Sequence, residues 1–102
     1  MDKYDKIIDQ IEKIRCTRHG LLEKTKVAMK MILTYIGEQG PNVLNRDISE
    51  YLSIEIQRVQ KLTSTLYKYD AISRVEMSNV ASKKKPIYGF TLNSKHPILK
   101  EG

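Results

Sequence analysis

Hydrophobic residues recur at a helical spacing over the first part of the chain and then change to a strand spacing. Up to about residue 69, apolar side chains return every three or four positions, with charged and polar residues between them. This spacing is typical of helices with one buried face. Over residues 72–77 and 87–92 the pattern changes to a period of two, seen best where Tyr88, Phe90 and Leu92 alternate with Ile87, Gly89 and Thr91, which is the period of a half-buried strand. We therefore expect an α+β, mostly helical protein whose strands lie near the C-terminus.

The first expected helix runs to about residue 15, and a break follows at residues 16–20. Its apolar stripe consists of Tyr4, Ile7, Ile8, Ile11 and Ile14. Asp2 is placed to cap this helix, and the acidic residues in its first turns suit the helix dipole. We treat residues 1–19 as an N-terminal amphipathic helix, which either covers part of the core or serves as a dimerisation arm.

A second helix is expected over residues 21–36, with Gly37 or Gly40 as its stop. Its apolar face is expected to contain Val27, Ala28, Met31, Ile32, Tyr35 and Ile36. The lysines of this helix, Lys24, Lys26 and Lys30, are expected at solvated positions, with contacts to a DNA backbone as the alternative. After a turn, residues 43–44 are suited to a short extended piece.

Two further helices separated by a tight joint form the most informative segment. A helix of barely two turns is expected to begin with Asn45 as its N-cap, and the joint falls at Ser53 and Ile54. The next helix covers residues 55–69, and its inner side contains Val59, Leu62, Thr63 and Leu66. A helix-turn-helix requires this pattern, because its second helix is held by the inner face while a polar outer face enters the major groove of DNA.

The outer face of helix 55–69 carries side chains that suit base recognition. This face contains Ile56, Gln57, Gln60, Lys61 and Ser64, and Arg58 lies on its flank. Gln contacts adenine edges, Lys reaches guanine or phosphate, and Ser serves either role. We therefore predict that Gln57, Gln60, Lys61 and Ser64 face bases and that Arg58 contacts a phosphate.

The two strands are expected to form a hairpin whose loop, residues 78–86, is polar and basic. The loop contains Lys83, Lys84 and Lys85. A run of three lysines by itself is typical of a solvated loop. At the tip of a hairpin beside a recognition helix, the same run favours phosphate contacts whose strength falls steeply with salt. Residues 94–102 are expected to form a flexible tail.

Charge and composition favour a polyanionic partner. The formal net charge is +6, and residues 53–102 hold nine basic against four acidic residues, whereas residues 1–52 hold nine against eight. The basic excess therefore lies in the half that contains the hairpin. No apolar run is long enough to cross a bilayer, and a single cysteine fits a reducing interior. We expect a cytoplasmic protein, or an intracellular one encoded by a virus or plasmid.

The sequence offers little for catalysis or metal binding. Cys16 and His19 are spaced like half of a metal site, but only His96 in the tail remains to join them. An unreactive thiol is the preferred interpretation of Cys16, with a redox sensor as the alternative. There is no glycine-rich phosphate loop and no nucleophile in a recognisable context. We expect no enzyme activity, no metal, no cofactor and no small-molecule ligand, and we note Tyr67 and Tyr69 as a possible dimer patch.

From about residue 25 to residue 92, some two-thirds of the chain, the sequence resembles the winged helix-turn-helix family of small DNA-binding transcriptional regulators. The resemblance rests on the segment LNRDISEYLSIEIQRVQKLTSTLYKYDAISRV followed by KKKPIYGFTL. It implies a three-helix core with a C-terminal β-hairpin wing, here residues 20–93, preceded by the extra N-terminal helix. It also implies binding to double-stranded DNA, usually as a homodimer on a palindrome, and usually in transcriptional control.

Three positions depart from the family pattern, and two other functions stay open. Glu55 stands where Ser or Thr often caps the recognition helix, Asp70 stands at a turn that is often Gly, and Ile56 is apolar on the exposed face. One alternative is a winged-helix module that binds a protein partner, which the basic second half disfavours. The other is an architectural or segregation-type protein that coats DNA.

Overall fold

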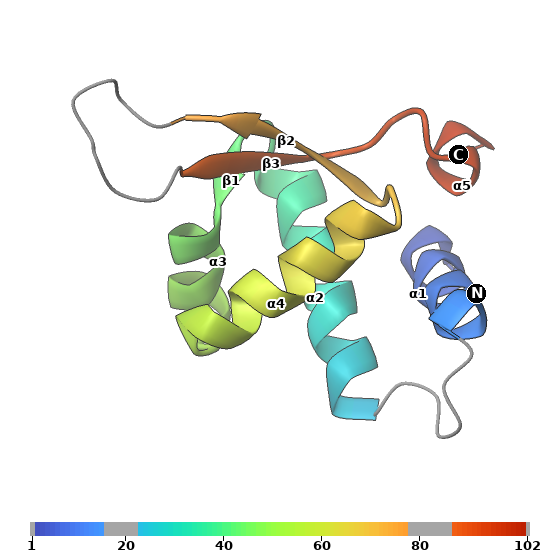
Figure 1. The fold of residues 1–102 in the computed structure, drawn as a ribbon, viewed down its shortest axis with the longest axis horizontal. Coiled ribbons are helices and arrows are strands. Elements are labelled where there is room, and N and C mark those ends of the chain that lie inside the picture. Colours follow the sequence, from blue (N-terminus) through green and yellow to red (C-terminus); the bar gives the residue numbers. More distant parts are fainter. Residues whose placement is uncertain (1, 16–22, 78–86, 102) are drawn as a thin grey trace.

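The computed structural model describes residues 2–15, 23–77 and 87–101, and this part of the chain is α+β and mostly helical (Figure 1). Its elements, in chain order, are α1 (Lys3–Arg15), α2 (Glu23–Gln39), β1 (Val43–Leu44), α3 (Asn45–Leu52), α4 (Ile56–Lys68), β2 (Ile72–Glu76), β3 (Tyr88–Leu92) and α5 (Pro97–Glu101). The predicted change from helical to strand spacing near residue 70 is confirmed, with small differences at the ends of elements.

Three short strands form an antiparallel sheet in the order β1-β3-β2. β2 and β3 pair along their full lengths, as expected for a hairpin. The extended piece at residues 43–44 is β1, which pairs with the other edge of β3. Gly89 permits this close approach, because a Cβ at that position would lie 2.9 Å from the Cα atom of Asn42.

The core lies between one face of the sheet and helices α2, α3 and α4 (Figure 1). The sheet contributes Val43, Ile72 and Phe90, all of which are buried. The inner side of α4 is the predicted one, since it buries Val59, Leu62, Thr63 and Leu66. Burying a large apolar side chain contributes about 1.5–3 kcal/mol, so this row holds α4 firmly by one face.

The buried face of α2 differs from the prediction. The helix buries Ala28, Met29, Ile32, Leu33 and Ile36, whereas Val27 and Met31, expected inside, are 51% and 40% exposed. The cause is that α2 packs against α1 on one side and against α4 and the sheet on another. The buried stripe therefore lies where these contacts converge, rotated by about one residue position from the face expected from spacing alone.

Helices α1 and α5 pack together at the end of the molecule opposite α3 (Figure 1). In α1, the residues Ile7, Ile8 and Ile11 are buried and belong to the core of the same chain. The expectation of a flexible tail at residues 94–102 is wrong for its described part. The chain forms α5, which packs beside α1, His96 is buried, and Ile98 and Leu99 pack against the core.

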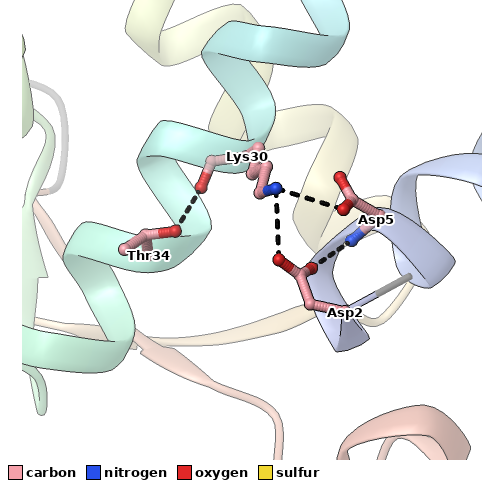
Figure 2. Close-up of polar contacts among 4 residues, drawn as sticks. All are labelled: Asp2, Asp5, Lys30 and Thr34. Carbon is pink, nitrogen blue, oxygen red and sulfur yellow. Dashed lines mark hydrogen bonds and ion pairs between the residues drawn. The ribbon is translucent and has the colours of Figure 1, made fainter.

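Polar contacts join α1 to α2 (Figure 2). The Nζ atom of Lys30 lies 3.1 Å from carboxylate oxygens of both Asp2 and Asp5, and Lys26 lies 2.9 Å from Glu12. Asp2 also caps α1 as predicted, because its carboxylate accepts a hydrogen bond from the Asp5 backbone N–H (2.9 Å). Lys26 and Lys30, expected at solvated positions, stay partly exposed (31% and 41% of the side chain) and in addition pair with carboxylates of α1 and of its N-cap.

These contacts shift the ionisation of the groups involved. The pKa of Asp2 is lowered, first by the hydrogen bond from the Asp5 backbone and then by Lys30. The pKa of Lys30 is raised by its bonds to Asp5 and Asp2, and that of Lys26 is raised by its bond to Glu12. The charged forms are therefore the ones that hold α1 on α2.

Candidate nucleic-acid interface

The exposed side of α4 presents a row of polar side chains. Gln57, Gln60, Lys61 and Ser64 are exposed and line one shallow hollow on the surface of this helix. The structure therefore brings together the four residues that were predicted to face bases. Arg58 is exposed as well, but it lines a different groove, beside Val27 and Met31 of α2, which agrees with its predicted place on the flank.

The joint before α4 holds this row in position. Ser53 adopts a left-handed conformation (φ 55°), and the hydroxyl of Ser49 donates to the carbonyl oxygen of Ile54 at 2.6 Å. The backbone N–H of Ile54 donates in return to the carbonyl oxygen of Ser49 at 3.2 Å. The tight joint predicted at Ser53 and Ile54 is confirmed.

Asn45 does not cap α3, contrary to the prediction. The N-cap is Leu44, whose backbone N–H donates to the carboxylate of Asp47 at 3.4 Å. The side-chain oxygen of Asn45 instead accepts a hydrogen bond from the buried hydroxyl of Thr63 at 2.8 Å. This bond joins α3 directly to α4, so Asn45 helps to set the angle at which α4 presents its polar face.

Glu55 occupies the N-cap position of α4 without making a side-chain capping bond. The residue is exposed, and Ile56 next to it is 36% exposed. Two of the three departures noted in the sequence, Glu55 and Ile56, therefore lie at the surface where α4 begins.

Ion pairing distinguishes two lysines of α2 from two basic residues of α4. Within the described residues, Lys26 and Lys30 are paired with carboxylates of α1, whereas Arg58 and Lys61 have no acidic side chain within 4 Å. Paired cations have little attraction left for a polyanion, and unpaired surface cations keep theirs. Of these four cations, Arg58 and Lys61 of α4 are therefore the ones that remain available to a polyanion.

Positive and negative charges balance over the described part of residues 44–92. The basic residues there are Arg46, Arg58, Lys61, Lys68 and Arg74, and the acidic ones are Asp47, Glu50, Glu55, Asp70 and Glu76. The positive excess of this segment therefore comes entirely from the loop lysines Lys83, Lys84 and Lys85. These three lie outside the described residues, while the hairpin that carries them is closed by a backbone hydrogen bond from Met77 to Ile87 at 2.6 Å.

Two basic residues that sequence reasoning did not select lie beside α4. Arg46 lines a hollow between α3, α4 and β3 together with Gln60 and Tyr88. Arg74 of β2 is exposed, and its guanidinium lies between the rings of Tyr67 and Tyr88. The sequence signal for Arg74 was its position two residues after buried Ile72, which puts both side chains on the sheet face that looks toward α4.

The tyrosines suggested as a dimer patch have contacts within the chain. Tyr67 stacks on Arg74, and Tyr69 is partly buried against the core. A different pair, Tyr35 and Tyr51, stacks with ring centres 4.6 Å apart and joins α2 to α3.

No metal-binding group is evident where the structure describes the chain. Residues 2–15, 23–77 and 87–101 contain no set of three or more His, Cys, Asp or Glu side chains placed to hold an ion. Cys16 and His19 lie outside these ranges. His96 is buried, and its Nδ1 atom accepts a hydrogen bond from the Ile98 backbone (3.2 Å).

Helices in the described ranges are too short or too polar to span a bilayer. A comparison with protein families and a search of curated proteins each found no match to the chain.

Proposed function

We propose that this protein binds double-stranded DNA as a winged helix-turn-helix regulator of transcription and catalyses no reaction. In this proposal α3 and α4 form the helix-turn-helix, β2 and β3 form the wing, and α4 lies in the major groove. Gln57, Gln60, Lys61 and Ser64 face the bases, Arg58 holds a phosphate at the flank, and Lys83, Lys84 and Lys85 hold phosphates from the wing.

One observation carries the proposal. The face of α4 opposite the core is a polar row that contains the unpaired cation Lys61, and it lies beside a hairpin whose loop supplies the whole positive excess of residues 44–92. A helix held by one face, with polar side chains on the other, suits entry into a groove about 12 Å wide. A basic loop beside it suits the adjoining phosphates.

We also propose that the protein acts as a homodimer. The described surface includes an apolar groove on α2 and the start of α4, formed by Val27, Ala28, Met31 and Ile54. Its rim carries both signs of charge, with Glu23 opposed by Lys24 and Arg58. In a twofold-symmetric pair the same patch meets itself, so an apolar centre with a rim of mixed charge is complementary to a second copy.

The proposal is tested by electrophoretic retardation of random-sequence duplex DNA at low salt, followed by footprinting on a site selected from random duplexes. Retardation that is lost as salt rises, with protection of one short palindrome, is the expected result. Absence of retardation at low salt would reject DNA binding in favour of a protein-binding module. Protection that extends along the whole duplex would instead indicate a DNA-coating protein.

A further inference from the structure

Arg74 is held between two aromatic rings that come from different elements. Its guanidinium carbon lies 4.1 Å from the ring centre of Tyr67 on α4 and 4.2 Å from that of Tyr88 on β3. Arg74 and Tyr88 share a face of the hairpin, because Arg74 is opposite Phe90 and Tyr88 is opposite Glu76. The recognition helix and both strands of the hairpin therefore meet at this one side chain.

The two aromatic contacts of Arg74 do not use the N–H donors of its guanidinium. A guanidinium is planar, with five N–H donors directed outward in its plane, and here two rings lie close to its central carbon. Stacking on aromatic rings stabilises the cation and restricts the rotamers of its side chain. Arg74 is exposed, and it forms no ion pair with a described carboxylate. The result is an exposed guanidinium that two aromatic contacts restrain and whose N–H donors are available to a ligand.

The position of this guanidinium relative to α4 indicates its ligand. Tyr88 lines the hollow between α3, α4 and β3 together with Gln60, so Arg74 lies on the hairpin side of the polar row of α4. If α4 occupies the major groove, the phosphate backbone that borders this groove passes between α4 and the hairpin loop. Arginine binds phosphate oxygens with two parallel N–H donors, and a stacked guanidinium is oriented for that geometry.

We propose that Arg74, clamped by Tyr67 and Tyr88, binds a backbone phosphate of the DNA strand that separates α4 from the wing. This inference rests on the proposed function and adds a phosphate site that connects the two DNA-binding elements. Tyr67 and Tyr88 are positioning residues in it, because they act by fixing the direction of the guanidinium.

The test measures dissociation constants of the full chain for one duplex over a series of salt concentrations. Arg74→Gln is expected to weaken binding about tenfold, the loss typical of a hydrogen bond to a charged group, and to reduce the salt slope by about 0.9, or one phosphate contact. Arg74→Lys is expected to keep the slope and lose affinity severalfold, because it retains the charge without the planar fork. Tyr67→Leu or Tyr88→Leu should behave like Arg74→Lys.

Lys95→Gln provides the matched control. Lys95 is exposed and lies between β3 and α5, so its substitution removes the same unit of charge away from the proposed interface. Affinity within twofold of the unaltered protein is expected. Equal effects of Arg74→Gln and Lys95→Gln on a bound duplex would overturn the phosphate site while leaving DNA binding intact. Failure of the unaltered protein to bind would instead reject the proposed function.

A duplex with single methylphosphonate substitutions locates the contact. One neutralised phosphate should weaken the unaltered protein and have no further effect on Arg74→Gln, because the two changes remove the same interaction. Additive losses at every phosphate would contradict the assignment. Circular dichroism of each variant verifies that it is folded. If Arg74→Gln does not fold, the loss of affinity is measured on Arg74→Lys instead.

Discussion

Glu55 places a negative charge at the start of α4, next to the polar row that we assign to DNA. Its side chain makes no capping hydrogen bond, so replacing Glu55 removes no hydrogen bond from the N-terminus of α4. A carboxylate near backbone phosphates costs roughly 0.5 kcal/mol for each phosphate about 8 Å away in water. The residue is therefore unfavourable for DNA affinity in our account.

We predict that Glu55→Gln raises affinity for duplex DNA about two- to fivefold at low salt, and less at high salt because the repulsion is screened. Fluorescence anisotropy with a labelled duplex measures the change. Glu38→Gln, an exposed position on α2, removes an equal charge away from α4 and serves as control. An unchanged or weaker affinity of the Glu55 variant would mean that phosphates do not approach the start of α4.

The roles of residues on and around α4 could be predicted from the sequence where they follow from the 3.6-residue period of the helix. They could not be predicted where they depend on a contact with a residue far away along the chain. The division of α4 into buried and polar sides follows from 3.6-residue spacing, and the structure agrees with it. Asn45 was assigned a local capping role, yet its partner is Thr63, eighteen positions away. The clamp on Arg74 likewise requires the sheet register, which spacing within one strand does not reveal.

Among the elements, α1 depends on charged contacts as well as on its apolar stripe. Lys30 of α2 reaches two carboxylates at the start of α1. The lowered pKa of Asp2 means that its carboxylate stabilises the folded state above its ordinary pKa of 3.8, and that this contribution is lost as pH falls through the lower folded value. The raised pKa of Lys30 means that its contribution is present below 10.5 and is lost as pH rises through the higher folded value.

We predict that Lys30→Gln lowers the melting temperature between about pH 5 and pH 10, where both partners are charged. The difference from the unaltered protein should shrink below about pH 3.8 and again above about pH 10.5. Thermal melts followed by circular dichroism measure this, with Lys6→Gln on the exposed side of α1 as control. A loss that is the same at every pH, or that the control reproduces, would show that the ion pairs do not hold α1.

The existence of each major helix and strand was predictable from the sequence, but the faces they use were less so. α2 carries apolar residues around much of its circumference, so its spacing is compatible with several buried faces. Only the packing of α1, α4 and the sheet selects Met29 and Leu33 over Val27 and Met31. α5 was missed because a five-residue helix has too few residues to show a period.

For the molecule as a whole, we predict that the groove on α2 holds a second copy. Met31→Glu should convert the dimer to a monomer at micromolar concentration, because a carboxylate at the centre of an apolar interface loses its hydration. Sedimentation equilibrium measures the mass. Val75→Glu, at a residue 55% exposed on the outer face of the sheet, should leave the mass unchanged. A monomeric unaltered protein, or a dimeric Met31 variant, would contradict this interface.

The central claim is that the protein binds duplex DNA through α4 and through its three loop lysines, which supply the positive excess of residues 44–92. The salt dependence of binding tests it most directly, measured on several unrelated duplexes for the unaltered protein, the triple variant Lys83→Ala, Lys84→Ala, Lys85→Ala, and Gln60→Ala. Loss of three phosphate contacts should flatten the slope of log affinity against log salt by about 2.7 on every duplex. Gln60→Ala should keep the slope and change the order of preference among duplexes. An unchanged slope in the triple variant, or the same effect from both variants, would contradict the account.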